Sequence, residues 1–314
     1  MRIDTVNIQK AAQTALIQEA QSAHFYTQQG ASRYSDTVKT GANKGKECAV
    51  NLRHARKENL YPSITHIHKC LSEKALTYYR ESHLLAAAEN LTKGPDETMV
   101  DYYHRVNIEA RKDSMDAAQT GTNVHNGLEA ILKGQPWDKS DPQLVKAARW
   151  VSENIKETIW TEKTLVNHSL KLAGRCDALV RFSEKSTHWN ELGRHPVVLD
   201  FKTRRFKEIS GKWVGAQYRK DIRQVAFYAA CLNLGQPART ANLLLNTTPE
   251  APEDLPLELV VYTRKKQFEA LVSVAYLAAV WRDENNYQPQ EVTIPAAEAQ
   301  RMKPVVERML ECMQ

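Results

Sequence analysis

Apolar residues recur at helical spacing through the first half of the chain. The pattern predicts helices over residues 6–22, 61–90, 95–134 and 141–157. Ser63 or Thr65 can cap the second of these helices, and Asp141-Pro142 is a typical start for the last one. Residues 29–58 lack this period and mix glycine and serine with basic side chains, so we expect an irregular basic arm there.

Beyond residue 158 the pattern changes to short runs of β-branched and aliphatic residues. These runs predict strands over residues 158–166, 171–182, 197–203, 241–246 and 257–262. Helical segments at 219–234 and 264–285 separate or follow the later strands. Strands interrupted by helices, after a helical N-terminal portion, predict an α/β fold with a mixed central sheet flanked by helices.

The same pattern suggests how the chain is organised. Residues 1–60 are expected to form an N-terminal helix and the basic arm, and residues 61–314 a single domain. The expected parts of that domain are a helical part at 61–157, a sheet core at 158–262 and C-terminal helices at 263–314.

Composition narrows the class of protein. Of the 314 residues, 42% are hydrophobic and 25% charged, which is ordinary for a globular protein and argues against a collagen-like, coiled-coil or disordered chain. No window approaches the roughly 18 apolar residues of a membrane helix, and the N-terminus lacks the apolar stretch of a signal peptide. We therefore expect a cytoplasmic protein with no membrane partner. The five cysteines are far apart, which argues against a disulfide framework and a Cys-x2-Cys metal site.

Positive charge is concentrated in one segment. The chain has a formal net charge of +6, and residues 201–223 alone have the same net charge, from eight basic and two acidic side chains. Such a segment attracts a polyanion, and Phe206, Trp213 and Tyr218 within it could stack on bases. A solvated charged loop is the alternative explanation.

The predicted strand at 197–203 carries the strongest chemical signal. Its apolar run ends in Asp200-Phe201-Lys202, the only Asp/Glu-x-Lys triplet in the chain. Because side chains alternate along a strand, Asp200 and Lys202 emerge on the same face. One group could then bind a metal ion while the other lies beside the metal's water. A salt-bridged pair at a strand end is the alternative.

A second carboxylate belongs to Gly174-Arg175-Cys176-Asp177 on the preceding predicted strand. If the two strands are neighbours joined by the polar loop 183–196, Asp177 lies close to Asp200. Mg²⁺ takes oxygen ligands and keeps several waters, so two such carboxylates are what a magnesium site needs. Taken alone, Asp177 could equally be a turn or edge residue.

Two further motifs have ordinary explanations when each is taken alone. His125, at the end of Gly121-Thr122-Asn123-Val124-His125, lies in a predicted helix, where a histidine is more often packed and hydrogen-bonded than a ligand. Gln224 and Tyr228 are four residues apart, on one face of the 219–234 helix, as in any amphipathic helix.

The order of these motifs resembles a known family. Gly-x-x-x-His, a strand with Glu162, Gly-x-x-Asp, Asp-x-Lys and Gln-x-x-x-Tyr follow one another as in the RecB-type exonuclease branch of the PD-(D/E)xK nuclease superfamily. Upstream, Tyr61-Pro62-Ser63-Ile64-Thr65-His66-Ile67 looks like the segment before the core in phage exonucleases and the mitochondrial genome maintenance exonuclease. The resemblance implies a restriction-endonuclease-like core with the element order αβββαβ.

The resemblance implies a role for each matching residue. His125, Asp177, Asp200 and the carbonyl of Phe201 would bind one or two Mg²⁺ or Mn²⁺ ions. The catalytic set would be Glu162, Asp177, Asp200 and the catalytic lysine Lys202. The residues expected to contact DNA are Ser63, Thr65, Arg204, Arg205, Lys207, Lys212, Trp213, Arg219, Gln224 and Tyr228. An iron–sulfur cluster is not expected, because Cys312 is the only cysteine after Cys231.

The resemblance therefore implies a bacterial or phage-encoded, metal-dependent DNA exonuclease of recombination, repair or phage replication. Its substrate would be single-stranded DNA or free and frayed ends, and a single-strand annealing or binding protein could be its partner. Two alternatives stay open: a structure-specific or modification-dependent endonuclease on the same core, and a catalytically idle nucleic-acid-binding module.

Overall fold

The computed structural model describes most of the chain. The described residues are 24–39, 41, 44–68, 71, 74–232, 238–248, 251–252 and 257–313. The helix expected over 6–22 lies outside them. The described chain divides into two compact units, the first with residues 34–49 and 71–122, the second with residues 24–33, 50–70 and 123–313. The domain boundary expected at residue 60 stays a prediction.

The first unit contains a hairpin and helices. Its elements are β3 (Ser35–Thr37), β4 (Glu47–Ala49), α4 (Lys74–Asn90) and the first part of α5 (Met99–Leu132). β3 and β4 pair antiparallel. The Tyr102 hydroxyl donates hydrogen bonds to the carbonyls of Ala88 and Leu91 and so ties α5 to the end of α4. α5 continues without a break through Gly121.

The second unit is built on a five-stranded mixed sheet. Its strands, in spatial order, are β12 (Glu258–Val261), β11 (Arg239–Asn246), β8 (Val197–Arg204), β7 (Leu172–Phe182) and β6 (Ile155–Asn167). β8 and β11 run parallel, and every other neighbouring pair is antiparallel. All five predicted strands are present, with ends shifted by a few residues.

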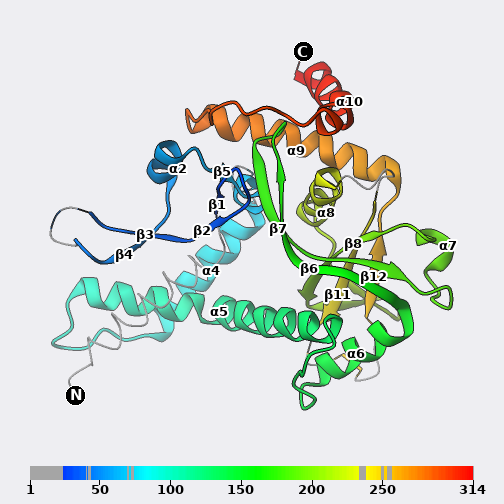
Figure 1. Ribbon diagram of the computed structural model, residues 1–314. Helices are drawn as coiled ribbons and strands as arrows, with labels where there is room; N and C mark the ends of the chain where they lie inside the picture. The colour runs from blue at the N-terminus through cyan, green and yellow to red at the C-terminus, as the bar shows by residue number, and fades with distance from the viewer. Residues whose placement is uncertain are drawn as a thin grey trace. The chain divides into compact units, whose positions relative to one another are not determined.

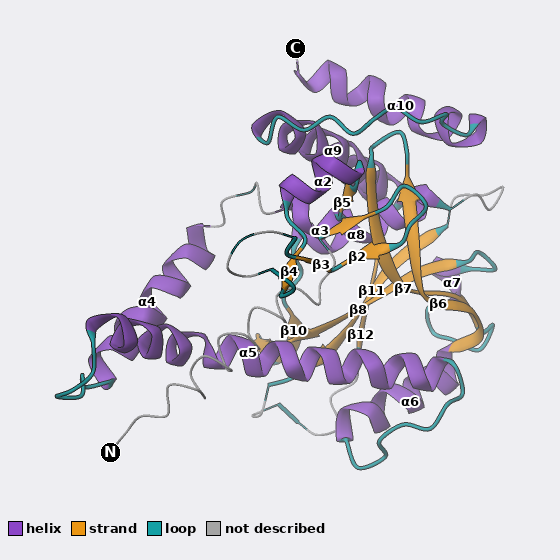
Figure 2. Ribbon diagram, turned by 60° about the vertical axis from the view of Figure 1, so that its left-hand side comes forward, coloured by secondary structure: helices purple, strands orange, loops and turns teal. Residues whose placement is uncertain are grey.

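Helices cover both faces of this sheet (Figure 1). The helices on one face are α3 (Ile64–Ile67), α8 (Arg219–Cys231), α9 (Arg264–Glu284) and α10 (Ala296–Met313). Figure 2 shows α10 outside α9. The other face carries the end of α5 and α6 (Pro142–Asn154). The α/β class, with a mixed sheet flanked by helices, is therefore confirmed.

Alternation along β8 separates the two apolar cores. Val198 packs in the core beneath α8 and α9, whereas Val197, Leu199 and Phe201 pack in the core beneath α5 and α6. Because side chains alternate, Asp200 falls on the same face as Val198, toward α8.

The remaining elements of the second unit are short. They are β1 (Phe25–Tyr26), β2 (Ser32–Arg33), α2 (Leu52–Glu58), β5 (Tyr61–Pro62), α7 (Trp189–Leu192), β9 (Phe206–Ile209) and β10 (Lys212–Gly215). The described part of 29–58 is thus not irregular, and Asn51 caps α2 by accepting from the N–H groups of Arg53 and His54. The basic segment contains the β9–β10 hairpin. Among the described residues, no helix combines the length and apolar character needed to cross a membrane.

Two predicted helices have different ends. The segment predicted over 61–90 begins as β5 and α3, and α4 starts only at Lys74. The helix predicted over 141–157 ends at Asn154, because Ile155 already pairs with Phe182 in the sheet. Tertiary pairing therefore decides the state of residues whose local pattern fits a helix.

Three motifs that are distant in the sequence meet at Gly174 on β7. A Cβ at Gly174 would lie 2.9 Å from Cε1 of Tyr228 in α8 and 3.0 Å from Cγ2 of Ile64 in α3. Both neighbours are fully buried. Glycine is therefore what lets α3 and α8 approach the strand that carries Asp177.

Gly174→Ala should lower the free energy of unfolding by about 1–3 kcal/mol, because the added methyl group overpacks a buried contact. Urea unfolding followed by circular dichroism measures the change. Gly94→Ala is the matched control, since the nearest atom to its new Cβ would be Cβ of Glu97 at an ordinary 3.5 Å. Equal stability of Gly174→Ala and the wild type would contradict this account of the packing.

Candidate metal centre

β7 and β8 separate where each strand carries an aspartate. Their pairing ends with Ala178 opposite Leu199, so Asp177 and Asp200 are the next residues beyond the last pair. The Oδ2 atom of Asp177 accepts a 2.7 Å hydrogen bond from the main-chain N–H of Phe201. A buried N–H that has lost its strand partner needs such an acceptor. The two aspartates therefore lie at a fork in the sheet.

Three potential metal-binding side chains meet beside this fork. His125 from α5, Glu162 from β6 and Asp177 from β7 each offer one ligand atom, and these atoms lie within 4.8 Å of one another. Nε2 of His125 is 3.0 Å from the carbonyl oxygen of Phe201 and 3.5 Å from Oδ2 of Asp177. The fold thus brings together His125, Asp177 and the carbonyl of Phe201, which the sequence resemblance assigned to metal binding.

Asp200 is not a member of this group of three, and two other side chains hold it. Its Oδ2 atom lies 2.7 Å from Nζ of Lys202 and accepts a 2.6 Å hydrogen bond from Nδ2 of Asn242. The predicted placement of Asp200 and Lys202 on one face is therefore confirmed. The Oδ1 atom of Asp200 is buried and has no hydrogen-bond partner among the described residues.

The available donors fit a hard divalent cation. They comprise carboxylate oxygens, one main-chain carbonyl and one imidazole nitrogen, a set that suits Mg²⁺ or Mn²⁺. A buried carboxylate oxygen without a partner is costly, and a cation near Oδ1 of Asp200 would remove that cost. Asp177 on β7, Glu162 on β6 and His125 on α5 would hold the ion.

The backbone of Glu162 is in an unusual conformation. Its φ angle is 49°, in the left-handed region, which costs a residue with a Cβ about 1–2 kcal/mol. Its carboxylate pairs with the guanidinium of Arg175, with Oε2 2.7 Å from Nε. Backbone strain of this kind gathers at functional sites, and its position next to Asp177 supports a role for Glu162 there.

Burial and mutual repulsion raise the pKa values of these carboxyl groups. Burial, followed by the charge of Asp200, raises the pKa of Asp177 to about 6. Burial, followed by the charge of Asp177, raises the pKa of Glu162. Burial by itself would lower the pKa of Lys202, but the charges of Asp200 and Asp177 outweigh it and raise that pKa. Lys202 is therefore an ammonium group that can donate hydrogen bonds.

Gln224 and Tyr228 lie on α8 and interact directly. Nε2 of Gln224 donates a 3.0 Å hydrogen bond to the Tyr228 hydroxyl. Burial, followed by the charge of Asp200, raises the pKa of Tyr228 well above its ordinary value, so the hydroxyl stays neutral. Tyr228 is buried against β7, and the half-buried Gln224 is the member of the pair that a ligand could reach.

The residues expected to contact DNA differ in exposure. The exposed ones are Thr65, Arg205, Lys207, Lys212 and Arg219. Trp213 is half-buried. Ser63 is buried, and its hydroxyl caps α3 by accepting from the N–H of His66. The prediction that Ser63 caps a helix is therefore confirmed, although this helix, α3, is shorter than expected.

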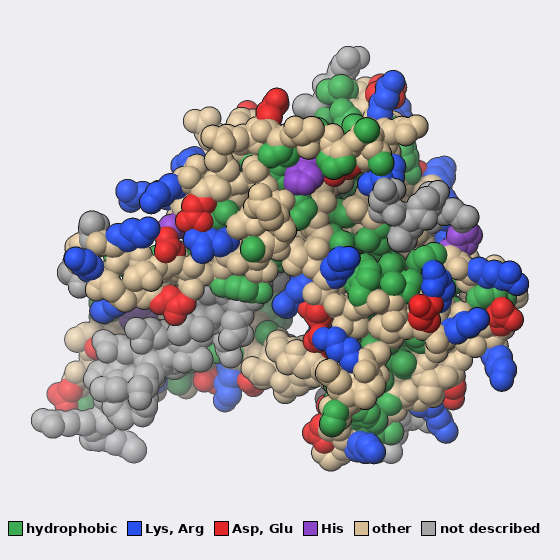
Figure 3. Space-filling model, in the orientation of Figure 1, with side chains coloured by type: hydrophobic (Ala, Val, Ile, Leu, Met, Phe, Trp, Pro, Cys, Tyr) green, Lys and Arg blue, Asp and Glu red, His purple; other side chains and the backbone are tan. Residues whose placement is uncertain are grey.

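Arg204 is engaged within the protein. Its guanidinium donates two hydrogen bonds to the carboxylate of Asp221, and its Cζ lies 5.0 Å from the ring centre of Tyr218. Tyr218 keeps 49% of its surface exposed, whereas Phe206 is buried and cannot stack on a base. On the face drawn in Figure 3, basic side chains of the described residues are scattered among acidic and uncharged ones.

Sequence reasoning missed the residues that surround Asp200. Asn242 is fully buried on β11, directly opposite Asp200, and its Oδ1 accepts a 2.8 Å hydrogen bond from the Tyr262 hydroxyl. A signal was present, because Asn242 is a lone amide inside the apolar run from Ala241 to Leu245. A buried polar residue in such a run is informative about a site.

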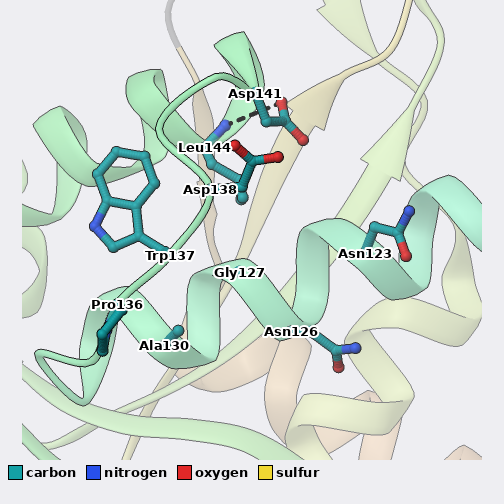
Figure 4. A pocket seen from close by; sticks show the side chains of 9 residues that line it. All are labelled: Asn123, Asn126, Gly127, Ala130, Pro136, Trp137, Asp138, Asp141 and Leu144. Carbon is teal, nitrogen blue, oxygen red and sulfur yellow. Dashed lines mark hydrogen bonds between the residues drawn. The ribbon is translucent and has the colours of Figure 1, made fainter.

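A separate hollow lies between α5 and α6 (Figure 4). Its α5 residues are Asn123, Asn126, Gly127 and Ala130. They form one helix face by their spacing, and His125 is not on that face. Of the two acids in the hollow, Asp141 caps α6 and Asp138 accepts hydrogen bonds from Ser140. The hollow is thus distinct from the metal centre.

In metal-free protein, Asp177→Asn should raise the free energy of unfolding at pH 7 by on the order of 2 kcal/mol. The pKa of Asp177 is about 6 in the folded protein and about 4 in an unfolded chain. The unfolded chain therefore binds fewer protons between these values, and wild-type stability falls as pH rises from 4 to 6. The asparagine side chain of the variant keeps an oxygen acceptor but has no charge to bury.

Urea unfolding in EDTA at several pH values measures this difference, with Asp116→Asn on the exposed part of α5 as control. The gain from Asp177→Asn should shrink as the pH falls toward 4. A gain that is the same at pH 4 and pH 7 would show that burial of charge is not its cause.

Comparison of the whole chain with known proteins adds no assignment. No protein-family model matches it, and no curated protein matches it.

Proposed function

We propose that the chain is a divalent-metal-dependent nuclease with a PD-(D/E)xK-type core that degrades DNA from its ends. The observation that carries this proposal is the fork between β7 and β8. It combines Asp177 and Asp200 with Lys202 on the Asp200 carboxylate, and with His125 and Glu162 beside Asp177. A structural salt bridge alone would not require this second group of ligands.

The order of elements supports the same core. α5, β6, β7, β8, α8 and β11 follow one another as αβββαβ, with α6, α7 and the β9–β10 hairpin between them. The three antiparallel strands are followed by a parallel strand, β11, which reaches β8 after the α8 crossover. The motifs fall on the elements that the resemblance implies: His125 on α5, the acids on β6 to β8, and Gln224 on α8.

Phosphodiester hydrolysis joins a water oxygen to phosphorus and breaks one bridging P–O bond. The water loses a proton to solvent, and the leaving oxygen gains one. A divalent ion, when bound, lowers the pKa of its water and neutralises charge on the phosphate. Asp177, Glu162 and His125 would hold that ion, and the partnerless oxygen of Asp200 is a further acceptor available to a cation at the fork.

Lys202 would act beside this ion as a hydrogen-bond donor. Its ammonium group is held 2.7 Å from the Asp200 carboxylate, with 17% of the side chain exposed. From there it can donate to the attacking water or to a phosphate oxygen, where negative charge increases in the transition state. The position of the Lys202 ammonium group therefore suits a hydrogen-bond donor that stabilises negative charge on the phosphate.

The basic segment would supply contacts with the phosphate backbone. Exposed cations follow Lys202 closely in the sequence, on the β9–β10 hairpin and at the start of α8. Cations of this kind bind nucleic acid without reading its sequence. Tyr218, which is half-exposed beside Arg204, is available to stack on an unpaired base. These features favour a single strand or a frayed end.

Digestion of end-labelled linear single- and double-stranded DNA, beside covalently closed circles, tests the proposal. With Mg²⁺ or Mn²⁺ the protein should shorten linear DNA and spare circles, and EDTA should abolish the reaction. Lys202→Ala should lower the rate by about 100-fold or more, because a donor to the transition state is lost.

Lys303→Ala is the matched control, since Lys303 pairs with Glu307 on the surface of α10, outside the site. Its rate should equal that of the wild type. Cut circles would instead support the endonuclease alternative. Binding of DNA without cleavage in either metal would overturn the catalytic proposal and favour the binding module.

A further inference from the structure

We infer that Asn242 and Tyr262 are positioning residues, which hold the Asp200 carboxylate so that its Oδ1 atom is left for the cation. This inference rests on the proposed metal site. It concerns two buried residues, one on β11 and one directly after β12, beyond the motif-bearing part of the fold.

Asn242 and Lys202 bind the same oxygen of Asp200. Asn242 lies opposite Asp200 in the parallel β8–β11 register, and its Nδ2 donates to Oδ2 of Asp200 at 2.6 Å. Nζ of Lys202 is 2.7 Å from that same atom. Two donors on Oδ2 fix the rotation of the carboxylate, and they leave Oδ1 as the acceptor without a partner among the described residues.

Tyr262 secures the orientation of the Asn242 amide. An amide has a donor end and an acceptor end, and a half-turn exchanges them. With the half-turn, Oδ1 of Asn242 would face the carboxylate of Asp200 and repel it. The Asp200 carboxylate only accepts, so Nδ2 of Asn242 faces it, and the Tyr262 hydroxyl, just after β12, holds this orientation by donating to Oδ1 of Asn242 at 2.8 Å.

Packing alone does not explain this chain of polar groups. Strand β11 is otherwise buried and largely apolar around Asn242, and an aliphatic residue there would avoid the cost of burying an amide. A buried network whose members are mutually bonded specifies one geometry. Mutation of a hydrogen-bond partner of a metal-binding carboxylate commonly lowers metal affinity by about 10- to 100-fold.

Tyr262→Phe tests the inference, because it removes only the hydroxyl group. Its affinity for Mn²⁺, measured from the electron paramagnetic resonance signal of free Mn²⁺, should fall by about 10-fold. DNA cleavage should require a correspondingly higher Mn²⁺ concentration and recover to within a few-fold of the wild-type rate at saturation. Asn242→Leu should weaken Mn²⁺ binding further, because it removes the donor itself.

Tyr287→Phe is the matched control. Tyr287 is also a buried tyrosine, but its hydroxyl donates to the carbonyls of Ala55 and Leu60, in a different part of the second unit. It should lower the melting temperature and leave the Mn²⁺ affinity unchanged. Comparing the two variants separates positioning from general stability.

The outcomes are distinguishable. If the wild type binds no Mn²⁺, the proposed function fails, and this inference fails with it. If the wild type binds Mn²⁺ and a folded Tyr262→Phe variant keeps that affinity within about two-fold, this inference alone is wrong. Equal loss of affinity in Tyr262→Phe and Tyr287→Phe would also overturn it, because it would indicate a purely structural effect. The result for Tyr262→Phe can be interpreted whether or not the Asn242→Leu variant folds.

Discussion

The hydrogen bond from the Phe201 N–H to the Asp177 carboxylate is the interaction on which the site depends. β7 and β8 cannot stay paired past Ala178 and Leu199 and still leave room for ligands between them. Their separation leaves the Phe201 N–H in the interior without a strand partner. Asp177 accepts a 2.7 Å hydrogen bond from it. The Asp177 carboxylate therefore satisfies the buried N–H at the fork and is also available to bind a cation there.

The fork also explains how charged groups can be buried together. Burial, followed by repulsion from Asp200, raises the pKa of Asp177 to about 6. Lys202 offsets part of this repulsion, and Arg175 does the same for Glu162 at the exposed side. Such an arrangement of acids is poor for stability without a cation and suits binding of one.

The two layers of helices contribute different side chains to this fork. α5 brings His125 from one face of the sheet, and its ring packs against the ring of Phe201 at 5.5 Å between centres. α8 brings Tyr228 from the other face, close enough to β7 that only glycine fits at position 174. Motifs far apart in the sequence are thus connected by side chains that pack against the sheet.

Much of the fold could be predicted from the sequence, because these features depend on residues that are close together in the chain. The five strands, α8, α9 and the shared face of Asp200 and Lys202 follow from the period of apolar residues along single elements. The run from Val197 to Lys202 was informative because a charged pair ends an apolar strand. The α/β class follows from the order of the elements. None of these features requires knowledge of which strands are neighbours.

Tertiary structure decided what depends on neighbours. The pairing of Ile155 with Phe182 turned the expected end of a helix into strand β6, and burial removed Phe206 from any surface role. Parallel pairing of β8 with β11 set Asn242 beside Asp200, 42 residues away in the chain. Periodicity shows which way a side chain points along its own element. It does not specify the register between elements, and that register determines which polar groups share one buried site.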